Sequence, residues 1–253
     1  MKDFETVVEL LRHSQWAIAL TGAGISVESG VPDFRSPGGL WDRFDPMEYA
    51  TIEAFRANPV KVWEMLREMN AVVKSARPNR AHLGFAALEE MGVLKALVTQ
   101  NIDDLHQKAG SRNVIEFHGN SRKLMCLYCH RQFDADLIEK QMEADGVFPP
   151  RCPEDGHILK PTVIFFGEDI PRAASLMAFQ EAERCDVILV VGTSATVFPA
   201  SSIPIMARQK GAKVVEINLT RTGLTEYVAH HSLQGNASEI LTELVDCLRD
   251  RRG

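Results

Sequence analysis

Residues 16–35, Trp-Ala-Ile-Ala-Leu-Thr-Gly-Ala-Gly-Ile-Ser-Val-Glu-Ser-Gly-Val-Pro-Asp-Phe-Arg, decide how this chain folds. The apolar run 16–20 predicts a buried strand that ends just before Gly22-Ala23-Gly24. Two glycines beside a strand end let peptide N–H groups approach a phosphate without a side chain in the way. The full dinucleotide-binding pattern has a third glycine where this chain has Val27, and residues 33–35 are charged and aromatic where a dehydrogenase would continue its helix. The stretch therefore predicts a dinucleotide site that does not perform hydride transfer.

Further apolar runs, bounded by turn residues, predict strands at 96–99, 114–117, 163–166, 187–191 and 214–217. Most of these runs lack polar alternation, which suits strands that are covered on both faces of a parallel sheet. Helical patterns separate several of them. Strands in alternation with helices predict an α/β fold with a doubly wound, Rossmann-like parallel sheet.

Two segments interrupt this alternation. Residues 36–76 have helical patterns and no strand signal, and residues 120–160 contain three clustered cysteines. We expect them to form a smaller inserted domain that combines a helical module with a zinc-ribbon-like, metal-binding module. The dinucleotide-binding, Rossmann-like domain would then comprise residues 1–35, 77–119 and 161–253.

Composition narrows the classes of function. The 253 residues carry a net charge of −6, which argues against a surface that binds nucleic acid directly. No stretch reaches the roughly 18 apolar residues of a membrane span. The first residues include acids and precede no apolar run, so we expect no signal peptide, and the odd number of cysteines favours metal ligation over disulfides. We expect a cytoplasmic monomer without membrane contacts.

Polar side chains follow the predicted strand 96–99. In an open α/β sheet, ligands bind beyond the carboxyl ends of the strands. Gln100, Asn101 and Asp103 could there hydrogen-bond a ribose, a carboxamide or a water molecule. The alternative is that Asn101 or Asp103 only caps the helix that follows.

The predicted strand 114–117 ends in His118-Gly119. A histidine titrates near neutral pH and can take a proton from a hydroxyl group. Because this strand end should share a crevice with the glycine loop and with Asn101, we interpret His118 as a general base. A structural role is the default interpretation for the other histidines considered, which are His13, His82, His106, His130, His230 and His231.

The clustered cysteines have the spacing of a metal site. Cys126 and Cys129 form a Cys-x-x-Cys pair, and Cys152 follows after 22 intervening residues. These are three of the four ligands of a structural zinc site, and either Asp155 or His157 could complete it. The alternative is a degenerate module that is held by packing or by a weaker metal site.

Three more predicted strands end in small or polar residues: Gly167-Glu168, Gly192-Thr193-Ser194 and Asn218. Each could be an ordinary turn. Because several neighbouring strand ends share this character, together they indicate a ligand-binding crevice.

Taken together, the motifs resemble the sirtuin family of NAD-dependent protein deacylases, in the form of a single catalytic core of the bacterial or archaeal type. The resemblance covers nearly the whole chain. It rests on residues 22–26, 30–35, 99–103, 118–119, 166–168, 192–194 and 218.

The resemblance implies that NAD is consumed. In the family, an acyl-lysine oxygen attacks the ribose carbon that carries nicotinamide, and the products are nicotinamide, free lysine and O-acyl-ADP-ribose. Carried over, His118 is the base, while Asn101 and Asp103 order the ribose, a water and the carboxamide. The resemblance implies cofactor contacts from Gly22, Ala23, Gly24, Ser26, Asp33, Phe34, Arg35, Gln100, Asn101, Ile102, Asp103, Gly192, Thr193, Ser194, Asn218 and Ala237.

The resemblance also implies the partner, an acyl-lysine protein or peptide that pairs as a strand with two segments of the chain. The substrate residues would be Ile164, Phe165, Phe166, Gly167, Glu168, Val197 and Phe198. It implies a structural Zn²⁺ on the cysteines, although Asp155 stands where the family has a fourth cysteine. Leu66 and Met69 align with a Tyr and an Arg of members that prefer succinyl or malonyl groups, so we expect uncharged acyl groups here.

Two other functions use the same residues. The ribose carbon could meet another nucleophile, which would give mono-ADP-ribosyl transfer, or the chain could be a module that only senses NAD. An open peptide groove together with Asn101, Asp103 and His118 favours the deacylase, because a pure binding module needs no titratable group at the ribose.

Overall fold

Six parallel strands form the larger of two units in the computed structural model, which describes residues 2–250. This sheet unit contains the segments Met1–Asp33, Ala76–Phe117 and Pro171–Gly253. The small unit contains Phe34–Ser75 and His118–Ile170, so residues 161–170 cluster with the small unit. In spatial order, the strands of the sheet unit are β3 (Val114–Glu116), β2 (Leu94–Thr99), β1 (Ala17–Thr21), β7 (Val187–Val191), β8 (Lys213–Asn218) and β9 (His231–Gln234).

The strand order changes direction at β1, which confirms the doubly wound α/β fold. Each neighbouring pair in the sheet is parallel, and β1 pairs with both β2 and β7. The chain runs outward from β1 to β3 on one side and from β7 to β9 on the other. In sheets of this kind the crevice for a ligand forms at the carboxyl ends of the strands at this switch point.

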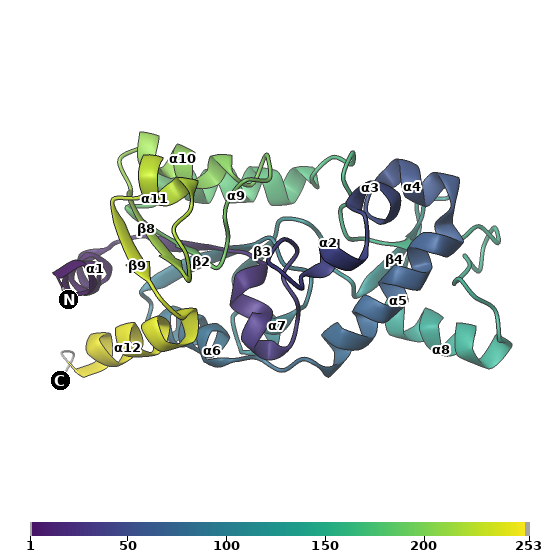
Figure 1. The fold of residues 1–253 in the computed structure, drawn as a ribbon, viewed down its shortest axis with the longest axis horizontal. Helices are drawn as coiled ribbons and strands as arrows, with labels where there is room; N and C mark the ends of the chain where they lie inside the picture. The colour runs from purple at the N-terminus through teal and green to yellow at the C-terminus, as the bar shows by residue number, and fades with distance from the viewer. Residues whose placement is uncertain (1, 251–253) are drawn as a thin grey trace. The chain divides into compact units, whose positions relative to one another are not determined.

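Helices cover both faces of this sheet (Figure 1). In the figure, α6 (Arg80–Glu90) and α12 (Ala237–Asp250) run along one side of the strands, and α9 (Arg172–Arg184) and α10 (Ser202–Gln209) run along the other. The apolar side of α12 is buried, as its helical spacing predicts. The remaining helical elements of the unit are α1 (Lys2–His13), η1 (Ala23–Ser29), α7 (Leu105–Lys108) and α11 (Gly223–Tyr227).

Burial explains why β1 and β7 are continuous apolar runs. Every residue of both strands is buried. They belong to one core cluster with residues of α1, α6 and α12. Helix α6 approaches α12 closely at Gly84, where a Cβ atom would lie 3.1 Å from the Cβ of Leu241.

The small unit has its own sheet and its own core. Strand β4 (Lys123–Cys126) pairs antiparallel with β5 (Gln132–Asp134) and with β6 (Leu159–Pro161). The buried Trp63 packs in this core, and its indole N–H donates to the carbonyl of Leu159 at 2.7 Å. The helices of the unit are α2 (Leu40–Arg43), α3 (Pro46–Tyr49), α4 (Ile52–Ala57), α5 (Pro59–Ser75) and α8 (Ala135–Asp145).

One strand prediction was wrong, and one strand of the six-stranded sheet was not predicted. Residues 163–166 are not a strand: alternate peptide N–H groups around this stretch donate to three different segments, at Lys123, His118 and Ala50, so no ladder forms. The strand β9 was not predicted because the sequence His-Ser-Leu-Gln is polar, and it lies at the edge of the sheet where only one of its residues is buried. Among residues 2–250, none of the helices has the length and the apolar content needed to cross a bilayer.

Candidate functional site

Two glycine turns interlock at the switch point of the sheet. The peptide N–H of Gly24, which follows β1, donates to the carbonyl of Gly192, which follows β7, at 2.8 Å. A Cβ atom on Gly24 would lie 2.8 Å from that carbonyl oxygen, and one on Gly192 would lie 2.4 Å from the nitrogen of Ile25. Gly192 also has a left-handed backbone, with φ of +61°. Neither turn can therefore accept a side chain without shifting the other.

A buried set of polar side chains lies beside the first glycine turn. The hydroxyl of Ser26 donates to Asp103 Oδ2 at 2.7 Å. The amide nitrogen of Asn101 donates to Ser26 Oγ and to the carbonyl of Gly22, both at 3.1 Å. All three side chains are buried. The structure thus brings together Ser26, Asn101 and Asp103, which the family resemblance predicts as cofactor contacts.

Helix capping was the alternative role for Asn101 and Asp103, and only Asp103 performs it. Its Oδ1 accepts a hydrogen bond from the peptide N–H of Leu105 at 3.0 Å, at the start of α7, while its Oδ2 accepts from Ser26. The amide of Asn101 bonds to the glycine turn and to Ser26 rather than to the helix. Asp103 therefore links the start of a helix to the buried polar set.

Hydrogen bonds among other predicted cofactor residues connect the carboxyl ends of β2, β7 and β8. The amide of Gln100 donates to Thr193 Oγ1 at 3.0 Å, and the amide of Asn218 donates to the carbonyl of Thr193 at 3.2 Å. Ser194 is exposed, and its hydroxyl is 3.3 Å from that of Thr196. Ala237 is the first residue of α12 and packs against the core cluster of the sheet unit.

The remaining predicted residues divide between the units. Asp33, Val197 and Phe198 belong to the sheet unit, whereas Phe34, Arg35, His118 and Ile164–Glu168 belong to the small unit. Within the small unit, the carbonyl of His118 accepts a hydrogen bond from the N–H of Ile164 at 2.9 Å. The ring of Trp41 lies 5.2 Å from that of Phe34 and 6.4 Å from that of Phe166, centroid to centroid.

Two buried histidines next to the polar set were assigned only a structural default by the sequence. His82 Nε2 is 3.4 Å from Ser26 Oγ, and its Nδ1 is 3.0 Å from Asn79 Oδ1. His106 Nε2 is 3.0 Å from Thr21 Oγ1, and the two imidazole centroids are 4.9 Å apart. The spacing of Asn79 and His82 fits a capping box, so their sequence pattern indicated a helix start and not a site.

Burial keeps both imidazoles neutral at physiological pH. It lowers the pKa of His82 to about 4, against the opposing effect of the negative Asp103. Burial also lowers the pKa of His106 well below its ordinary value, and the neighbouring His82 acts in the same direction. Neutral imidazoles can both donate and accept hydrogen bonds, which suits their contacts with hydroxyl groups.

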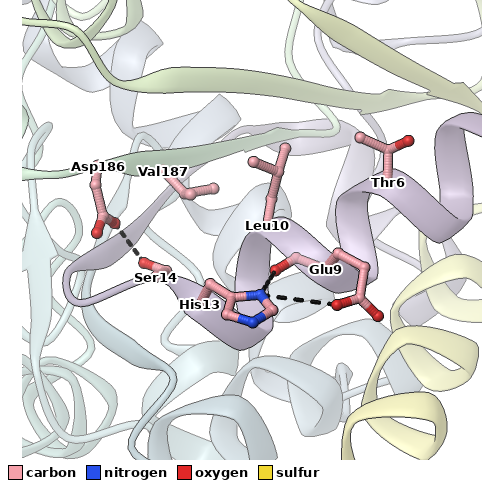
Figure 2. A pocket seen from close by; sticks show the side chains of 7 residues that line it. All are labelled: Thr6, Glu9, Leu10, His13, Ser14, Asp186 and Val187. Atoms are coloured by element: carbon pink, nitrogen blue, oxygen red, sulfur yellow. Dashed lines mark hydrogen bonds and ion pairs between the residues drawn. The ribbon is translucent and has the colours of Figure 1, made fainter.

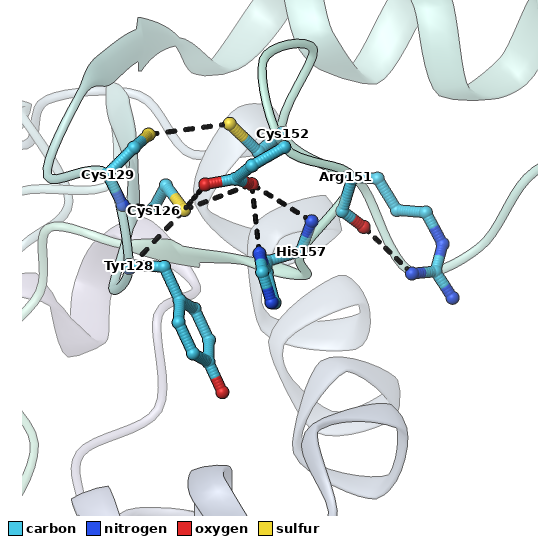
Figure 3. A network of polar contacts seen from close by, with 8 residues as sticks. Cys126, Tyr128, Cys129, Arg151, Cys152 and His157 are labelled. Carbon is cyan, nitrogen blue, oxygen red and sulfur yellow. Dashed lines mark hydrogen bonds and ion pairs between the residues drawn. The ribbon is translucent and has the colours of Figure 1, made fainter.

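Three sulfur atoms and a carboxylate converge in the small unit (Figure 3). The ligand atoms of Cys126, Cys129, Cys152 and Asp155 all lie within 4.8 Å of one another. The sulfurs of Cys129 and Cys152 are 3.7 Å apart, and Cys126 Sγ is 3.2 Å from Asp155 Oδ2. Two thiolates bound to one tetrahedral zinc at about 2.3 Å are about 3.8 Å apart. The donor set therefore fits a structural zinc ion.

The ligand atoms come from two turns of the same kind. The N–H of His130 donates to the carbonyl of Cys126 at 3.0 Å, and the N–H of Gly156 donates to that of Cys152 at 2.9 Å. His130 and Gly156 both have a left-handed backbone, with φ of 59° and 75°. The side chains at the equivalent positions, three residues after each first cysteine, are those of Cys129 and Asp155.

His157 contacts the carboxylate of Asp155. Its peptide N–H donates to Asp155 Oδ1 at 3.1 Å, and its Nδ1 is 3.2 Å from the same oxygen. The peptide N–H of His157 contributes most to holding the pKa of Asp155 well below its usual range. The imidazole ring stacks on Tyr128 with 3.7 Å between centroids (Figure 3).

A separate shallow pocket lies at the amino ends of β1 and β7 (Figure 2). There the hydroxyl of Ser14 and the peptide N–H of Gln15 donate to the carboxylate of Asp186. Ligands of parallel α/β sheets bind at the opposite, carboxyl ends of the strands, so we interpret this pocket as the junction between α1 and the sheet. It is lined by Thr6, Glu9, Leu10, His13, Ser14, Asp186 and Val187.

Comparisons with known proteins agree with this geometry. A model described as "Sir2 family" matches residues 22–199. NAD-dependent protein deacylase 1 of Archaeoglobus fulgidus is 44% identical, over 97% of this chain and 98% of the relative. A solved complex of a mutated Sir2 homologue with 2'-O-acetyl ADP ribose has a TM-score of 0.90, with 44% identity over 97% of this chain and 96% of that one. A solved Sir2–p53 peptide–NAD+ complex has a TM-score of 0.87, with 33% identity over 96% of this chain and 97% of that one.

The low pKa of His82 predicts a specific dependence of stability on pH. Between the ordinary value of 6.5 and about 4, the unfolded chain binds a proton at this residue that the folded chain does not. The free energy of unfolding should therefore fall as the pH falls through this window. In His82→Gln, the free energy of unfolding should fall by up to about 3 kcal/mol less than in the wild type across this window. The pH dependence that remains should come from His106.

Urea denaturation of the wild type and of His82→Gln from pH 7 to pH 4.5 measures this effect. His13→Gln is the matched control, because the side chain of His13 is 75% exposed. Equal slopes for the wild type and His82→Gln would contradict the assignment of a neutral, buried His82.

Proposed function

The chain belongs to the Sir2 family, the sirtuins, and from that premise we propose how its own residues perform the family's reaction. It is an NAD-dependent protein deacylase that produces O-acetyl-ADP-ribose. The observation that carries the assignment of residues is the buried set of Ser26, Asn101 and Asp103 beside a glycine turn at the switch point of the sheet. Bound NAD supplies an electrophilic ribose carbon and nicotinamide as the leaving group.

The glycine turn and its neighbours are proposed to hold the pyrophosphate and the adenosine of NAD. The peptide N–H groups of Gly22 and Gly24 donate to the carbonyls of Val191 and Gly192, so the peptide N–H of Ala23, at the start of η1, is the one proposed to face the pyrophosphate. Gln100 and Asn218 both donate to Thr193, to its hydroxyl and its carbonyl oxygen, which supports a preformed adenosine side. We assign the remaining cofactor contacts to Ile102, Gly192, Ser194 and Ala237, and to Asp33, Phe34 and Arg35 in the loop that follows the glycine turn.

Asn101 is proposed to contact the ligand directly, and Asp103 to act by orientation. Asn101 uses its amide N–H groups on Gly22 and Ser26, which leaves its side-chain carbonyl oxygen to accept a hydrogen bond from a ribose hydroxyl or a water. Both oxygens of Asp103 already accept hydrogen bonds, from Ser26 and from Leu105. Asp103 therefore fixes the hydroxyl of Ser26 and, through it, the amide of Asn101.

His118 is proposed as the general base. The acyl-lysine oxygen bonds to the ribose carbon as the bond from that carbon to nicotinamide breaks. His118 then takes the proton of a ribose hydroxyl, so that this oxygen can attack the acyl carbon. A water molecule adds its oxygen to the same carbon, the nitrogen of lysine leaves that carbon, and the products are lysine and O-acyl-ADP-ribose. The charge that develops on the ribose is best stabilised by fixed dipoles, and the hydrogen-bonded polar set of Ser26, Asn101 and Asp103 supplies them.

His118→Ala should lower kcat for an acetylated peptide by about 10²–10⁴-fold, because the ribose hydroxyl loses its proton acceptor. Nicotinamide release measures the rate, and mass spectrometry identifies the products. His13→Ala is the control, on an exposed face of α1. Wild-type turnover in His118→Ala would remove the proposed base, and ADP-ribose attached to the peptide would support mono-ADP-ribosyl transfer instead.

We propose that the enzyme prefers uncharged acyl groups. Leu66 and Met69 lie on α5 and are half-buried, and Leu66 packs against the core of the small unit. An acyl carboxylate beside these side chains would lose its hydration without gaining a partner.

The expected result is that kcat/KM for an acetylated peptide exceeds that for the succinylated peptide of the same sequence at least about tenfold. Met69→Arg should narrow this ratio, because it offers a partner to the carboxylate. Faster turnover of the succinylated peptide by the wild type would reject the proposal.

Asp155 is proposed as the fourth zinc ligand, with His157 as its hydrogen-bonding partner. The position of Asp155 in the second turn is equivalent to that of Cys129 in the first, which supports this choice over His157. Metal ligands are commonly oriented by a second residue, and His157 contacts the carboxylate in that manner. Zinc bound there would link the two turns and stabilise the small unit.

Asp155→Ala should bind zinc at least about 100-fold more weakly than the wild type, whereas His157→Ala should lose only about tenfold. Asp155→Cys should bind at least as tightly as the wild type, because zinc accepts four thiolates. Competition with a chelator, followed by measurement of protein-bound zinc, ranks the three variants by their affinity for zinc. The reverse order for the first two variants would assign the ligand to His157.

We further propose that the protein acts as a monomer in the cytoplasm. All five cysteines are unpaired thiols, which suits a reducing compartment. Light scattering of the purified protein can check the monomeric state against the chain mass of 28.2 kDa.

A further inference from the structure

A fully buried lysine lies beneath the turn that follows β6. Lys160 is 1% exposed. Its ammonium group donates to the carbonyls of Pro161 and Val163, at 3.0 and 2.6 Å, and to Glu168 Oε2, at 2.8 Å. An ammonium has three N–H donors, so all three are used. The same nitrogen lies 4.1 Å from the centroid of the Phe165 ring.

Glu168 connects this ammonium to the backbone of the turn. Its Oε2 also accepts a hydrogen bond from the peptide N–H of Phe165 at 2.7 Å. The peptide N–H of Glu168 in turn donates to the carbonyl of Phe165 at 3.0 Å, which closes the turn. Between them, Gly167 has φ of +86°, and a Cβ atom there would lie 3.0 Å from Glu53 Oε2. The lysine and the glutamate therefore fix the turn from its buried side.

The opposite side of the turn faces outward. Phe166 is 42% exposed and Gly167 is exposed. The peptide groups of Phe166 bond to Ala50 and Ile52, with N···O distances of 2.9 and 3.0 Å. In the part of the chain that the structure describes, the peptide N–H and carbonyl of Gly167 have no hydrogen-bond partner. These are the groups that an added strand would use.

Stability alone is a weak explanation for an ion pair at this place. Burial lowers the pKa of Lys160, which the negative charge of Glu168 opposes, so the charged form has a cost that the pair offsets. Apolar residues of similar volume often stabilise a core equally well or better. What apolar residues cannot do is hold two carbonyls and a carboxylate at one point.

We propose that Lys160 and Glu168 are positioning residues, which hold residues 163–168 in the conformation that pairs with the main chain of an extended acyl-lysine peptide. This inference rests on the proposed function and on the expectation, implied by the family resemblance, that residues 164–168 bind the peptide. The pair acts through the backbone of the turn, since the ammonium is buried and its hydrogen bonds are all internal.

The test compares Lys160→Met with a matched variant of the same unit. Lys160→Met should raise KM for an acetylated peptide about tenfold, with kcat within about threefold and KM for NAD within about twofold of the wild-type values. Lys160→Arg keeps the charge but changes the geometry of the N–H donors. Its KM for the peptide should lie between those of the wild type and Lys160→Met. The control is Trp63→Phe, which removes a buried hydrogen bond to Leu159 but none of the hydrogen bonds that Lys160 and Glu168 make. It should lower the Tm without changing KM for the peptide.

Hydrogen exchange provides a readout that does not depend on activity. The amide protons of Phe165 and Glu168 should exchange at least about tenfold faster in Lys160→Met than in Trp63→Phe, because the first variant alone releases the turn. If Lys160→Met does not fold, Lys160→Arg is compared with Trp63→Phe instead, because it keeps the charge and changes only the donor geometry at the turn.

The outcomes separate the two proposals. An unchanged peptide KM in Lys160→Met, or an equal rise in Trp63→Phe, overturns the positioning role while the deacylase assignment stands. Unchanged exchange at Phe165 and Glu168 overturns it as well. A wild type that does not deacylate the peptide overturns the proposed function, and with it the peptide role of the turn.

Discussion

The close contact between two glycine turns is the constraint on which the rest of the sheet unit depends. The N–H of Gly24 meets the carbonyl of Gly192 at a separation that leaves no room for a Cβ atom on either residue. Because these turns follow β1 and β7, the contact holds the two strands that flank the switch point at their carboxyl ends. It also sets where η1 begins, and thus where Ser26 lies. A dinucleotide site at this point is a consequence of backbone packing before any side chain takes part.

The polar groups beside this contact are held without an uncompensated charge. Asp103 is the one carboxylate of the buried set, and its oxygens accept hydrogen bonds from a hydroxyl and a peptide N–H. Burial keeps His82 and His106 neutral, so they fill the space behind Ser26 and Thr21 as hydrogen-bonding partners. A site prepared in this way has its dipoles already oriented before a ligand binds, which is the condition under which such dipoles stabilise a developing charge most.

The sequence predicted the sheet and the polar strand ends because both leave local signals. The buried strands are mostly apolar, and polar residues stand at their carboxyl ends, as with Asn101 after β2 and Asn218 at the end of β8. His82 left no such signal, because its neighbour Asn79 gives it the pattern of a helix start while tertiary packing brings it to Ser26. Residues 163–166 are apolar enough for a strand, but their hydrogen bonds go to segments far apart in the sequence, which no local pattern records.

The same long-range bonding links the metal module to the turn that presents residues 164–168. Cys126, a zinc ligand in the proposed set, is the last residue of β4 and pairs with Leu159 of β6, while its neighbour Met125 pairs with Lys160. The position of the lysine ammonium is thus set by a strand whose partner ends at the metal site. A small unit with few core residues gains most from such cross-links, since they fix a register that packing alone specifies weakly. Zinc bound at the proposed site would thus constrain, through β4 and β6, the backbone of the turn that we propose to pair with the peptide.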